Sequence, residues 1–404
     1  MKRLQAFKFE LIPNGEQQRE MRCFAGSCRF VYNKALALQK ENYEAGNQFI
    51  SYVSMAANLP HWKREPGMEW LKNAPSQSLQ HALKDLEKAY QNFFAKRSEC
   101  PRFKRKGSGD SFRYPDPKQL KLDQVNSRLF LPKLGWMRYR NSRDVLGVLR
   151  NATVSQSGGK WFVSIQTQRE LAAVVTKATS AIGVDVGIVH FATMSDASHI
   201  APLNSFRKHQ ERLSRYQRRM SRKVKFSNNW KKEKNKVQQV HIKIANARKD
   251  FLHKTTTTIS QNHALVCIED LQIRNMSKSS KGNCETRGKM VKQKSGLNRA
   301  ILDQGWGEFR RQLNYKMTWN GGMLLAVPPH NTSRTCPCCE HISKDNRLTQ
   351  DKFLCIDCGY ENNADVVGAI NILERGHRLL ACGELVQSGH SVKQEPTEVI
   401  HACA

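Results

Sequence analysis

Two Cys-x-x-Cys pairs near the C-terminal end are the clearest chemical signal in the sequence. They are Cys336 with Cys339 and Cys355 with Cys358, and fifteen residues separate them. Two such turns can place four thiolates around one tetrahedral ion at ~2.3 Å, with the intervening residues forming a hairpin. The spacing predicts structural zinc, because four protein ligands close the shell and leave no place for a reactive water. Cys338 makes the first pair ambiguous, and a chance grouping of buried cysteines is the plainer alternative.

Three carboxylates stand where elements of secondary structure are expected to end or begin. Asp185 ends the apolar run "AIGVD", Glu269 ends "ALVCIE", and Asp365 precedes the helical run "VVGAINIL". Two strands and a helix are the parts from which an RNase H-like site is built. Two Mg²⁺ ions about 3.5–4 Å apart need several clustered carboxylates to hold them. In that chemistry one ion activates water, and the other stabilises the leaving 3′ oxygen.

Each of these acids also has a plainer explanation when it is taken alone. An Asp at a helix start is most often a cap, and Glu269 could face solvent beside Asp270. Asp185 is harder to explain, because valines flank it on a strand that is expected to be buried. A cluster of acids is also costly unless cations compensate it. Spacing alone therefore leaves the metal site and the structural alternatives open.

The charge balance favours a polyanionic partner. The chain has 66 Lys and Arg against 35 Asp and Glu, a net charge of +31, and nucleic acid is the commonest partner of such a protein. Residues 207–249 alone hold sixteen Lys and Arg but two acids, and an apolar stripe in their second half predicts a packed helix with a basic outer face. A surface that tracks phosphates is the favoured interpretation, with a merely solvated helix face as the alternative.

The start of the chain predicts a cytoplasmic protein. "MKRLQAFKFELIPNGE" alternates like a strand and lacks the apolar centre of a signal peptide, and no apolar run reaches the ~18–20 residues that span a bilayer. Cysteines in that compartment stay reduced, so paired cysteines are better read as metal ligands than as disulfides. Cys23, Cys28 and the other isolated cysteines are assigned to core packing.

Hydrophobic periodicity divides the chain into segments. Alternation predicts a strand before Pro13, spacings of three and four predict helices over 14–98, and a basic loop then leads to strands within 120–170. Ser157-Gly158-Gly159 has the composition of a hairpin turn. Residues 279–296, polar and rich in Gly and Ser, are expected to form a mobile loop.

Short segments along nearly the whole chain resemble, in the same order, the TnpB (OrfB) family encoded by insertion sequences. That family is related to type V CRISPR effector nucleases. The segments are "FKFELIPNGEQ", "CRFVYNKAL", "LQHALKDLEKAYQNFF", "LPKLGW", "GVDVGIVHFAT", "IEDLQIRNM", "WGEFRRQLNYK", the four-cysteine ribbon and "ADVVGAINIL".

The resemblance implies an α+β multidomain fold. Its RNase H-like (RuvC) nuclease domain would be interrupted by a zinc ribbon, and an N-terminal wedge β-barrel would carry an inserted helical recognition lobe. The implied boundaries are 1–13 and 99–175 for the barrel, 14–98 for the lobe, 181–330 and 360–380 for the nuclease domain, 331–359 for the ribbon and 381–404 for a C-terminal tail.

The resemblance also implies an activity and its partners. Asp185, Glu269 and Asp365 match the family's metal-binding acids, which implies a Mg²⁺-dependent DNA endonuclease that binds RNA from the transposon end. The guide segment of that RNA would pair with one strand of double-stranded DNA beside a short motif, near which Tyr52 and Gln80 fall. A bacterial, nucleoid-associated monomer with its RNA and no membrane partner is expected. The short motif, the guide sequence and the cleavage pattern do not follow from the residues.

Departures from the family pattern keep other functions in view. Many members have Asp-x-Asn-Ala-Ala at the last acid, but Val367 and Gly368 stand in the Asn and first Ala places, and Ala364 stands where many have Arg. A nuclease-inactive, RNA-guided DNA-binding regulator is therefore the main alternative. A strand-joining transposase is less favoured, because no Tyr accompanies a His-hydrophobic-His frame. A plain zinc-ribbon binder would leave Asp185 unexplained.

Overall fold

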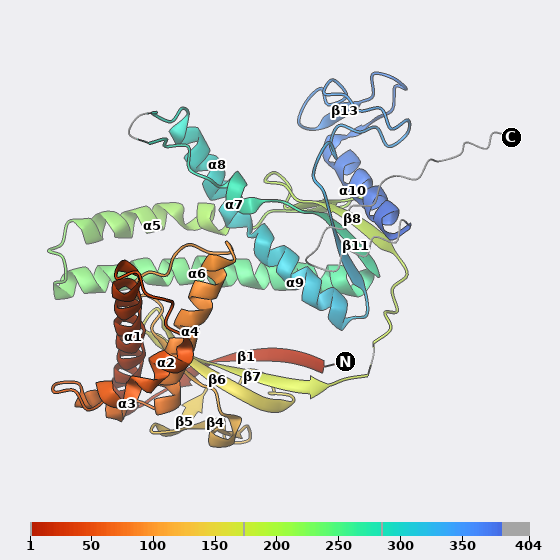
Figure 1. Ribbon diagram of the computed structural model, residues 1–404. Helices are drawn as coiled ribbons and strands as arrows, with labels where there is room; N and C mark the ends of the chain where they lie inside the picture. Colours follow the sequence, from red (N-terminus) through yellow and green to blue (C-terminus); the bar gives the residue numbers. More distant parts are fainter. Residues whose placement is uncertain (1, 173, 284–285, 382–404) are drawn as a thin grey trace. The chain divides into compact units, whose positions relative to one another are not determined.

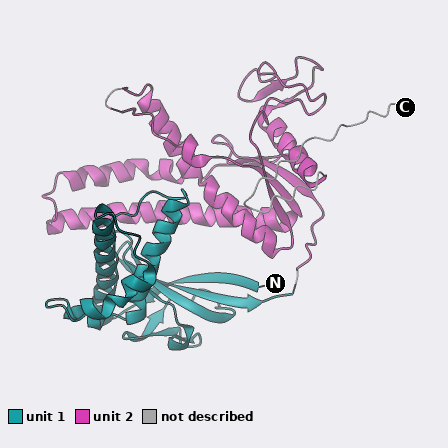
Figure 2. Ribbon diagram, viewed as in Figure 1, with its two compact units in different colours: residues 1–172 teal, residues 173–404 magenta. Residues whose placement is uncertain are grey.

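The computed structural model describes residues 2–172, 174–283 and 286–381. The chain divides into two compact units, residues 1–172 and 173–404, each with helices and strands (Figure 2). The expectation of an α+β protein with more than one domain is confirmed at this level. The predicted tail 381–404 lies, except for residue 381, outside the described residues. No helix in the described ranges has both the length and the apolar character needed to cross a membrane.

Unit 1 is built on a seven-stranded antiparallel sheet in the order β2-β6-β7-β1-β5-β4-β3. The predicted first strand is confirmed, with Phe7 and Phe9 buried on one face. Gly158 and Gly159, both at positive φ, close the predicted hairpin. The strands are β1 Lys2–Ile12, β2 Ser111–Tyr114, β3 Lys121–Asp123, β4 Arg128–Leu131, β5 Gly135–Tyr139, β6 Val148–Ser157 and β7 Lys160–Glu170.

The helices of unit 1 lie between β1 and β2, as the periodicity predicts. Asn14 and Gln17 form a capping box at the start of the first, and the Gln17 amide also donates to the Leu134 carbonyl at 3.0 Å. Buried residues of these helices share one apolar core with the sheet. The helices are α1 Gly15–Glu44, α2 Tyr52–Ala57, α3 Leu59–Trp62 and α4 Ser76–Phe94, with 3₁₀ turns at Glu69–Asn73 and Pro117–Gln119.

The assignment of the isolated cysteines to the core is confirmed for Cys28 and Cys267, which are buried. Cys23 and Cys100 are exposed, so the assignment of these two to the core is wrong. Cys23 and Cys28 are five residues apart, which places them roughly 140° apart around a helix and on different faces. Cys284, Cys382 and Cys403 lie outside the described residues.

Unit 2 is built on a five-stranded sheet in the order β10-β9-β8-β11-β12. The predicted strands before Asp185 and Glu269 are confirmed, and both residues are the last of their strands. β8, β11 and β12 run parallel, while β9 pairs antiparallel with β8 and with β10. The strands are β8 Ala181–Asp185, β9 Ala192–Met194, β10 His199–Ile200, β11 Leu265–Glu269 and β12 Met323–Val327.

The basic stretch forms two helices, α5 Ser205–Ser221 and α6 Asn228–Asn262, which lie side by side (Figure 1). The packed helix predicted for its second half is α6. Leu213 packs with Val237, Val240 and Ile244 in the seam between the two. Fifteen of the sixteen basic side chains are exposed and Arg248 is partly buried, so the basic outer face is confirmed.

The expected loop 279–296 is partly helical. α8 Val291–Gln304 begins inside it, and α7 Ile273–Met276 precedes it. Gly296, which favoured a loop in the sequence, sits within α8 with no atom near the position of an added Cβ. The loop prediction is therefore wrong for residues 291–296, and residues 284–285 are outside the described ranges.

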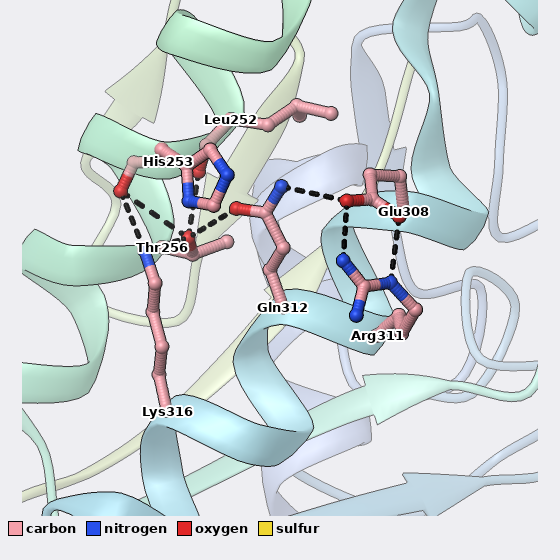
Figure 3. A network of polar contacts seen from close by, with 7 residues as sticks. All are labelled: Leu252, His253, Thr256, Glu308, Arg311, Gln312 and Lys316. Carbon is pink, nitrogen blue, oxygen red and sulfur yellow. Dashed lines mark hydrogen bonds and ion pairs between the residues drawn. The ribbon is translucent and has the colours of Figure 1, made fainter. Parts of the chain in front are cut away.

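A polar network centred on the buried Thr256 and Gln312 joins α6 to α9 Trp306–Trp319 (Figure 3). The Thr256 hydroxyl donates to the Gln312 side-chain oxygen at 3.0 Å, and the Gln312 amide donates to the Glu308 carboxylate at 2.9 Å. Glu308 also pairs with Arg311 at 2.7 Å. Lys316 donates to Thr256 at 2.8 Å, and burial lowers the pKa of Lys316 to about 8. Since β12 follows α9 directly, this network helps to fix one edge of the sheet.

The four-cysteine segment leads from β12 into α10 Ala364–Ala381. Its strands β13 Lys352–Leu354 and β14 Glu361–Asn363 pair antiparallel, and α10 begins at the next residue. α10 packs on β8, β9, β11 and β12. A Cβ on Gly183 of β8 would lie 2.0 Å from the Ala369 carbonyl oxygen, so glycine is needed for this close approach.

Candidate metal centre and carboxylate cluster

The four predicted cysteines meet in one cluster. Ligand atoms of Cys336, Cys339, Cys355 and Cys358 all lie within 4.8 Å of one another. Cys336 and Cys358 place their sulfurs 3.6 Å apart, and the Cys339 and Cys355 sulfurs are 3.5 Å apart. Sulfurs around tetrahedral zinc stand roughly 3.8 Å apart, so the donor set fits that ion. Cys338 is exposed and outside the cluster, which removes the ambiguity of the first pair.

A buried asparagine holds the two cysteine turns together. The Asn346 amide donates to the carbonyls of Arg334 and His341 at 3.0 and 3.1 Å, and its oxygen accepts from the backbone N–H of Ile356 at 3.1 Å. One side chain thereby bridges the segments that carry both Cys-x-x-Cys pairs. Nothing in the cysteine spacing indicates this residue, although it is the one Asn between the two Cys-x-x-Cys pairs.

Asp185 and Glu269 come together at the carboxyl ends of neighbouring parallel strands. Val184 of β8 pairs with Ile268 of β11, so the two acids follow at the same level of the sheet. Asp365 is the second residue of α10, which packs on β8. Burial raises the pKa of Asp185 to about 8, and the charges of Glu269 and Asp365 add to the rise. The three carboxylates therefore share one electrostatic environment.

The carboxylate of Asp185 rests directly on the backbone of α10. A Cβ on Gly368 would lie 2.9 Å from Asp185 Oδ2, closer than side chains normally approach. Gly368 follows Asp365 by about one helical turn, so the same face of α10 carries Asp365 and the glycine against which the Asp185 carboxylate lies. The sequence flagged Gly368 only as a departure from the family pattern.

Glu269 is held by residues that sequence reasoning missed. Thr332 donates its hydroxyl to Glu269 Oε1 at 2.6 Å, and the Thr332 carbonyl accepts from Asn371 of α10 at 2.7 Å. Burial raises the pKa of Glu269, while the Thr332 hydrogen bond and the charge of Arg375 oppose the rise. The neighbouring Asp270 turns away and pairs with Arg310 of α9.

A cation from the four-cysteine segment reaches the acids. Arg347 lies 3.4 Å from Asp365 Oδ1, and the same nitrogen donates to the Gln350 carbonyl at 2.9 Å. Its charge lowers the pKa of Asp185 against the effect of burial. The hairpin of the cysteine segment thus contributes a side chain to the carboxylate cluster. The position of Arg347 in the sequence, between the two Cys-x-x-Cys pairs, does not predict this contact.

The carboxylates are spread more widely than the thiolates. Among the described residues, the four cysteines are the one group of three or more Cys, His, Asp or Glu whose ligand atoms all lie within 4.8 Å of one another. Oxygen ligands set apart on two strands and a helix match hard cations such as Mg²⁺, and a pair of ions needs ligands on both sides. Burial, and after it the charges of Glu269 and Asp365, raises the pKa of Asp185, and a bound cation would stabilise the ionised form of this carboxyl.

Tyr52 and Gln80 belong to unit 1, whereas the carboxylates belong to unit 2. Tyr52 begins α2, and the ammonium of Lys84 lies 5.0 Å from the centre of its ring. Gln80 is exposed on α4. Lys84 contacts Tyr52, and Gln80 lies one helical turn before Lys84 on the same helix.

Three family models match the chain. "Probable transposase" covers residues 162–280, which include Asp185 and Glu269, and "Cas12f1-like, TNB domain" covers 306–372, which include the four cysteines and Asp365. "Helix-turn-helix domain" covers residues 1–48. Within 2–48 the structure has a strand and one 30-residue helix, and no helix-turn-helix is present in those described residues.

Full-length relatives place the chain in a family. It is 60% identical over 100% of both chains to "Putative RNA-guided DNA endonuclease InsQ" of Escherichia coli (strain K12). It is 35% identical to "Putative RNA-guided DNA endonuclease" of Streptomyces pristinaespiralis, over 97% of this chain and 96% of the relative. The structure of "the Cas12f1-sgRNA-target DNA complex" shares the fold, with a TM-score of 0.55 at 12% identity over 92% of this chain and 98% of that one.

Fold and site together define a mixed α+β protein with a four-cysteine ribbon beside a carboxylate cluster. The chain belongs to the OrfB (TnpB) family, as the resemblance of its motifs predicts.

Proposed function

We propose that the protein is an RNA-guided, Mg²⁺-dependent DNA endonuclease encoded by a transposable element. The observation that carries the proposal is the meeting of Asp185, Glu269 and Asp365 at the carboxyl edge of the unit 2 sheet. The names of the two full-length relatives supply the RNA guide and the DNA substrate. Hydrolysis of a phosphodiester is the chemistry that such a cluster supports.

The residues of the carboxylate cluster and their neighbours have different roles in the proposed reaction. Bound Mg²⁺ would supply a nucleophilic water and neutralise charge on the leaving oxygen. Asp185, Glu269 and Asp365 would hold the ions, and Thr332 donates a hydrogen bond that orients the Glu269 carboxylate. The guanidinium of Arg347 stands beside Asp365, where it can bind a phosphate oxygen of the scissile strand.

The finer architecture is part of the proposal. Residues 181–330 and 360–380 would form an RNase H-like (RuvC) domain interrupted by the zinc ribbon 331–359. The sheet supports this assignment, because β11 and β12 run parallel to β8 on one side of it and β9 pairs antiparallel on the other side. Residues 1–13 and 99–175 would form the wedge β-barrel, with residues 14–98 as the recognition lobe.

Zinc in the four-cysteine cluster would be structural. It would fix the hairpin that presents Arg347 and the point at which the chain enters α10. Val367, Ala364 and Phe353 pack against Cys336 and Cys355, so α10 and the ribbon share one small core. A shift of the ribbon would therefore move Asp365 as well.

The same packing bears on the regulator alternative. Ala364 and Val367, the departures that favoured a nuclease-inactive protein, are fully buried in the ribbon core. They are packing residues, and all three acids are present beside them. The cleaving function is therefore the better supported of the two.

RNA from the transposon end and double-stranded DNA are the proposed partners. The α5–α6 pair offers many exposed basic side chains for backbone phosphates. Tyr52, which Lys84 contacts, and Gln80 are proposed to contact DNA beside the short target motif. A monomer with its RNA, acting in the cytoplasm on nucleoid DNA, is the proposed working form.

One assay tests this function. The chain is co-expressed with RNA from its transposon end and given plasmids that carry a matching target next to a randomised motif. Cutting of a subset of plasmids in Mg²⁺ is expected, with the cut products revealing the motif. Binding of the matching target without any cutting would overturn the endonuclease and favour the regulator.

A further inference from the structure

A large aromatic cavity opens at one end of the unit 1 helices. Its volume is about 540 Å³, within the range of roughly 300–1,000 Å³ typical of small-ligand sites. It lies where the last turns of α1 and α4 meet the segment between α1 and α2. Its aromatic lining residues are Tyr43, Phe49, Tyr90, Phe93 and Phe94.

The rings on one wall are held in fixed positions. Phe49 stands edge-on to Tyr90 and to Phe94, at centroid distances of 5.3 and 5.9 Å. Tyr90 and Phe94 lie 6.0 Å apart and within 26° of parallel. Phe94 is nevertheless 61% exposed and Tyr43 is 80% exposed, so flat aromatic faces are open to solvent. Gathered exposed rings of this kind indicate a binding surface.

The rim of the cavity is mixed in charge at its lining residues and basic beyond them. Lys40 and Glu44 both line the cavity, and the chain that leaves α4, which reaches the cavity at Cys100, carries exposed cations. The acid within that segment, Glu99, pairs with Arg102. The segment's cations are Lys96, Arg97, Arg102, Lys104, Arg105 and Lys106.

We propose that this cavity binds an unpaired nucleobase of a single-stranded segment of nucleic acid. The base stacks on Phe94 and its neighbours, and residues 96–106 hold the adjoining phosphates. Aromatic stacking together with a cationic groove is how proteins bind single strands without reading their sequence. The proposal rests on the proposed function for the class of its ligand, but its test requires no cleavage.

Charge favours this occupant over a second copy of the chain. A two-fold contact would bury the same patch on both copies and would bring two basic rims face to face. Like charges across an interface disfavour association. A polyanion instead pairs its phosphates with the rim while its bases cover the rings.

The test uses the full chain and a short oligo(U) RNA that contains one 2-aminopurine. Phe94→Leu keeps an apolar side chain but removes the ring, and it is expected to weaken binding about tenfold, the scale of one stacked base. It should also abolish the quenching of 2-aminopurine fluorescence seen with the wild type. Phe94→Trp should restore both signals. Trp136→Leu, at an exposed ring on β5 outside the cavity, is the matched control and should behave as the wild type.

Two results would overturn the proposal. One is wild-type affinity and quenching in Phe94→Leu. The other is a concentration-dependent wild-type dimer, seen by light scattering, that Phe94→Leu dissociates while its RNA affinity is unchanged, which would assign the cavity to a second copy. Failure of plasmid cutting with intact quenching would instead count against the proposed function alone.

Discussion

Asp185 and Gly368 are in direct contact across the junction of β8 and α10, with Asp185 Oδ2 2.9 Å from where a Cβ on residue 368 would stand. Glycine at this position allows the carboxylate to sit closer to the helix than a Cβ would permit. Position 368 therefore helps to set where Asp185 would offer its oxygens to the proposed Mg²⁺ ions.

Gly368→Ala is expected to displace the Asp185 carboxylate. Cutting should fall about tenfold, and the Mg²⁺ concentration for half-maximal rate should rise, while the affinity for RNA and target DNA stays unchanged. Stability should change little, since alanine favours a helix over glycine by up to about 1 kcal/mol. Gly296→Ala in α8, where a Cβ meets no atom, is the control. Wild-type Mg²⁺ dependence in Gly368→Ala would show that the contact has no catalytic consequence.

Arg347→Met should lower the cleavage rate by about 10²-fold, since it removes a positive charge beside Asp365 without unfolding the ribbon. Single-turnover cutting and bound zinc are the measurements. Lys344→Met changes an exposed cation of the same hairpin and should cut normally. Loss of zinc in Arg347→Met, or an unchanged rate, would contradict the assigned role.

The raised pKa of Asp185 predicts proton release when Mg²⁺ binds. The folded pKa of about 8 lies above the usual 3.8, so the metal-free folded state binds the extra proton between these values and loses stability as pH rises through them. Metal binding needs the ionised form, so affinity should increase with pH across that window. Calorimetry at pH 7 in buffers of different ionisation enthalpy measures the released proton.

Asp185→Asn should abolish that release and the pH dependence that accompanies it. Asp303→Asn changes a carboxylate of the same unit that accepts from the backbone of α5, and it serves as the control. A buffer-independent heat of Mg²⁺ binding by the wild-type protein would refute the linkage.

Cys355→Ser should remove zinc and impair both folding and cutting. The ribbon, Val367 and Ala364 share one core, so loss of the metal should loosen the start of α10 and move Asp365. Zinc content, thermal unfolding and cleavage should fall together. Cys338→Ser, at the exposed cysteine outside the cluster, should keep all three. A zinc-free Cys355→Ser protein that cuts at the wild-type rate would show that cutting does not depend on the zinc-bound ribbon.

Local patterns predicted the elements that hold the site. Short apolar runs ending in an acid located β8 and β11, with Asp185 and Glu269 at their ends, and the double Cys-x-x-Cys spacing located the sulfur cluster. Such signals lie within a few residues of one another, so periodicity and spacing are enough to find them.

The same reasoning could not predict contacts between residues that are far apart in the sequence. Arg347 reaches Asp365 because β13 and β14 fold back on each other, and Thr332 reaches Glu269 across 63 residues. The break between α5 and α6 contains no Gly or Pro, although Ser227, whose hydroxyl accepts from the N–H of Trp230, is a cap signal. Tertiary contacts, and not local propensity, determine these features.

Parallel measurement of target binding and target cutting by the acid variants tests the central claim most directly. Asp185→Asn, Glu269→Gln and Asp365→Asn, each assembled with transposon-end RNA, should bind a matching DNA as the wild type does. Each should cut it about 10³-fold more slowly or worse in Mg²⁺. Cutting near the wild-type rate by any of the three would contradict the account, because the cluster would then not be the nuclease site.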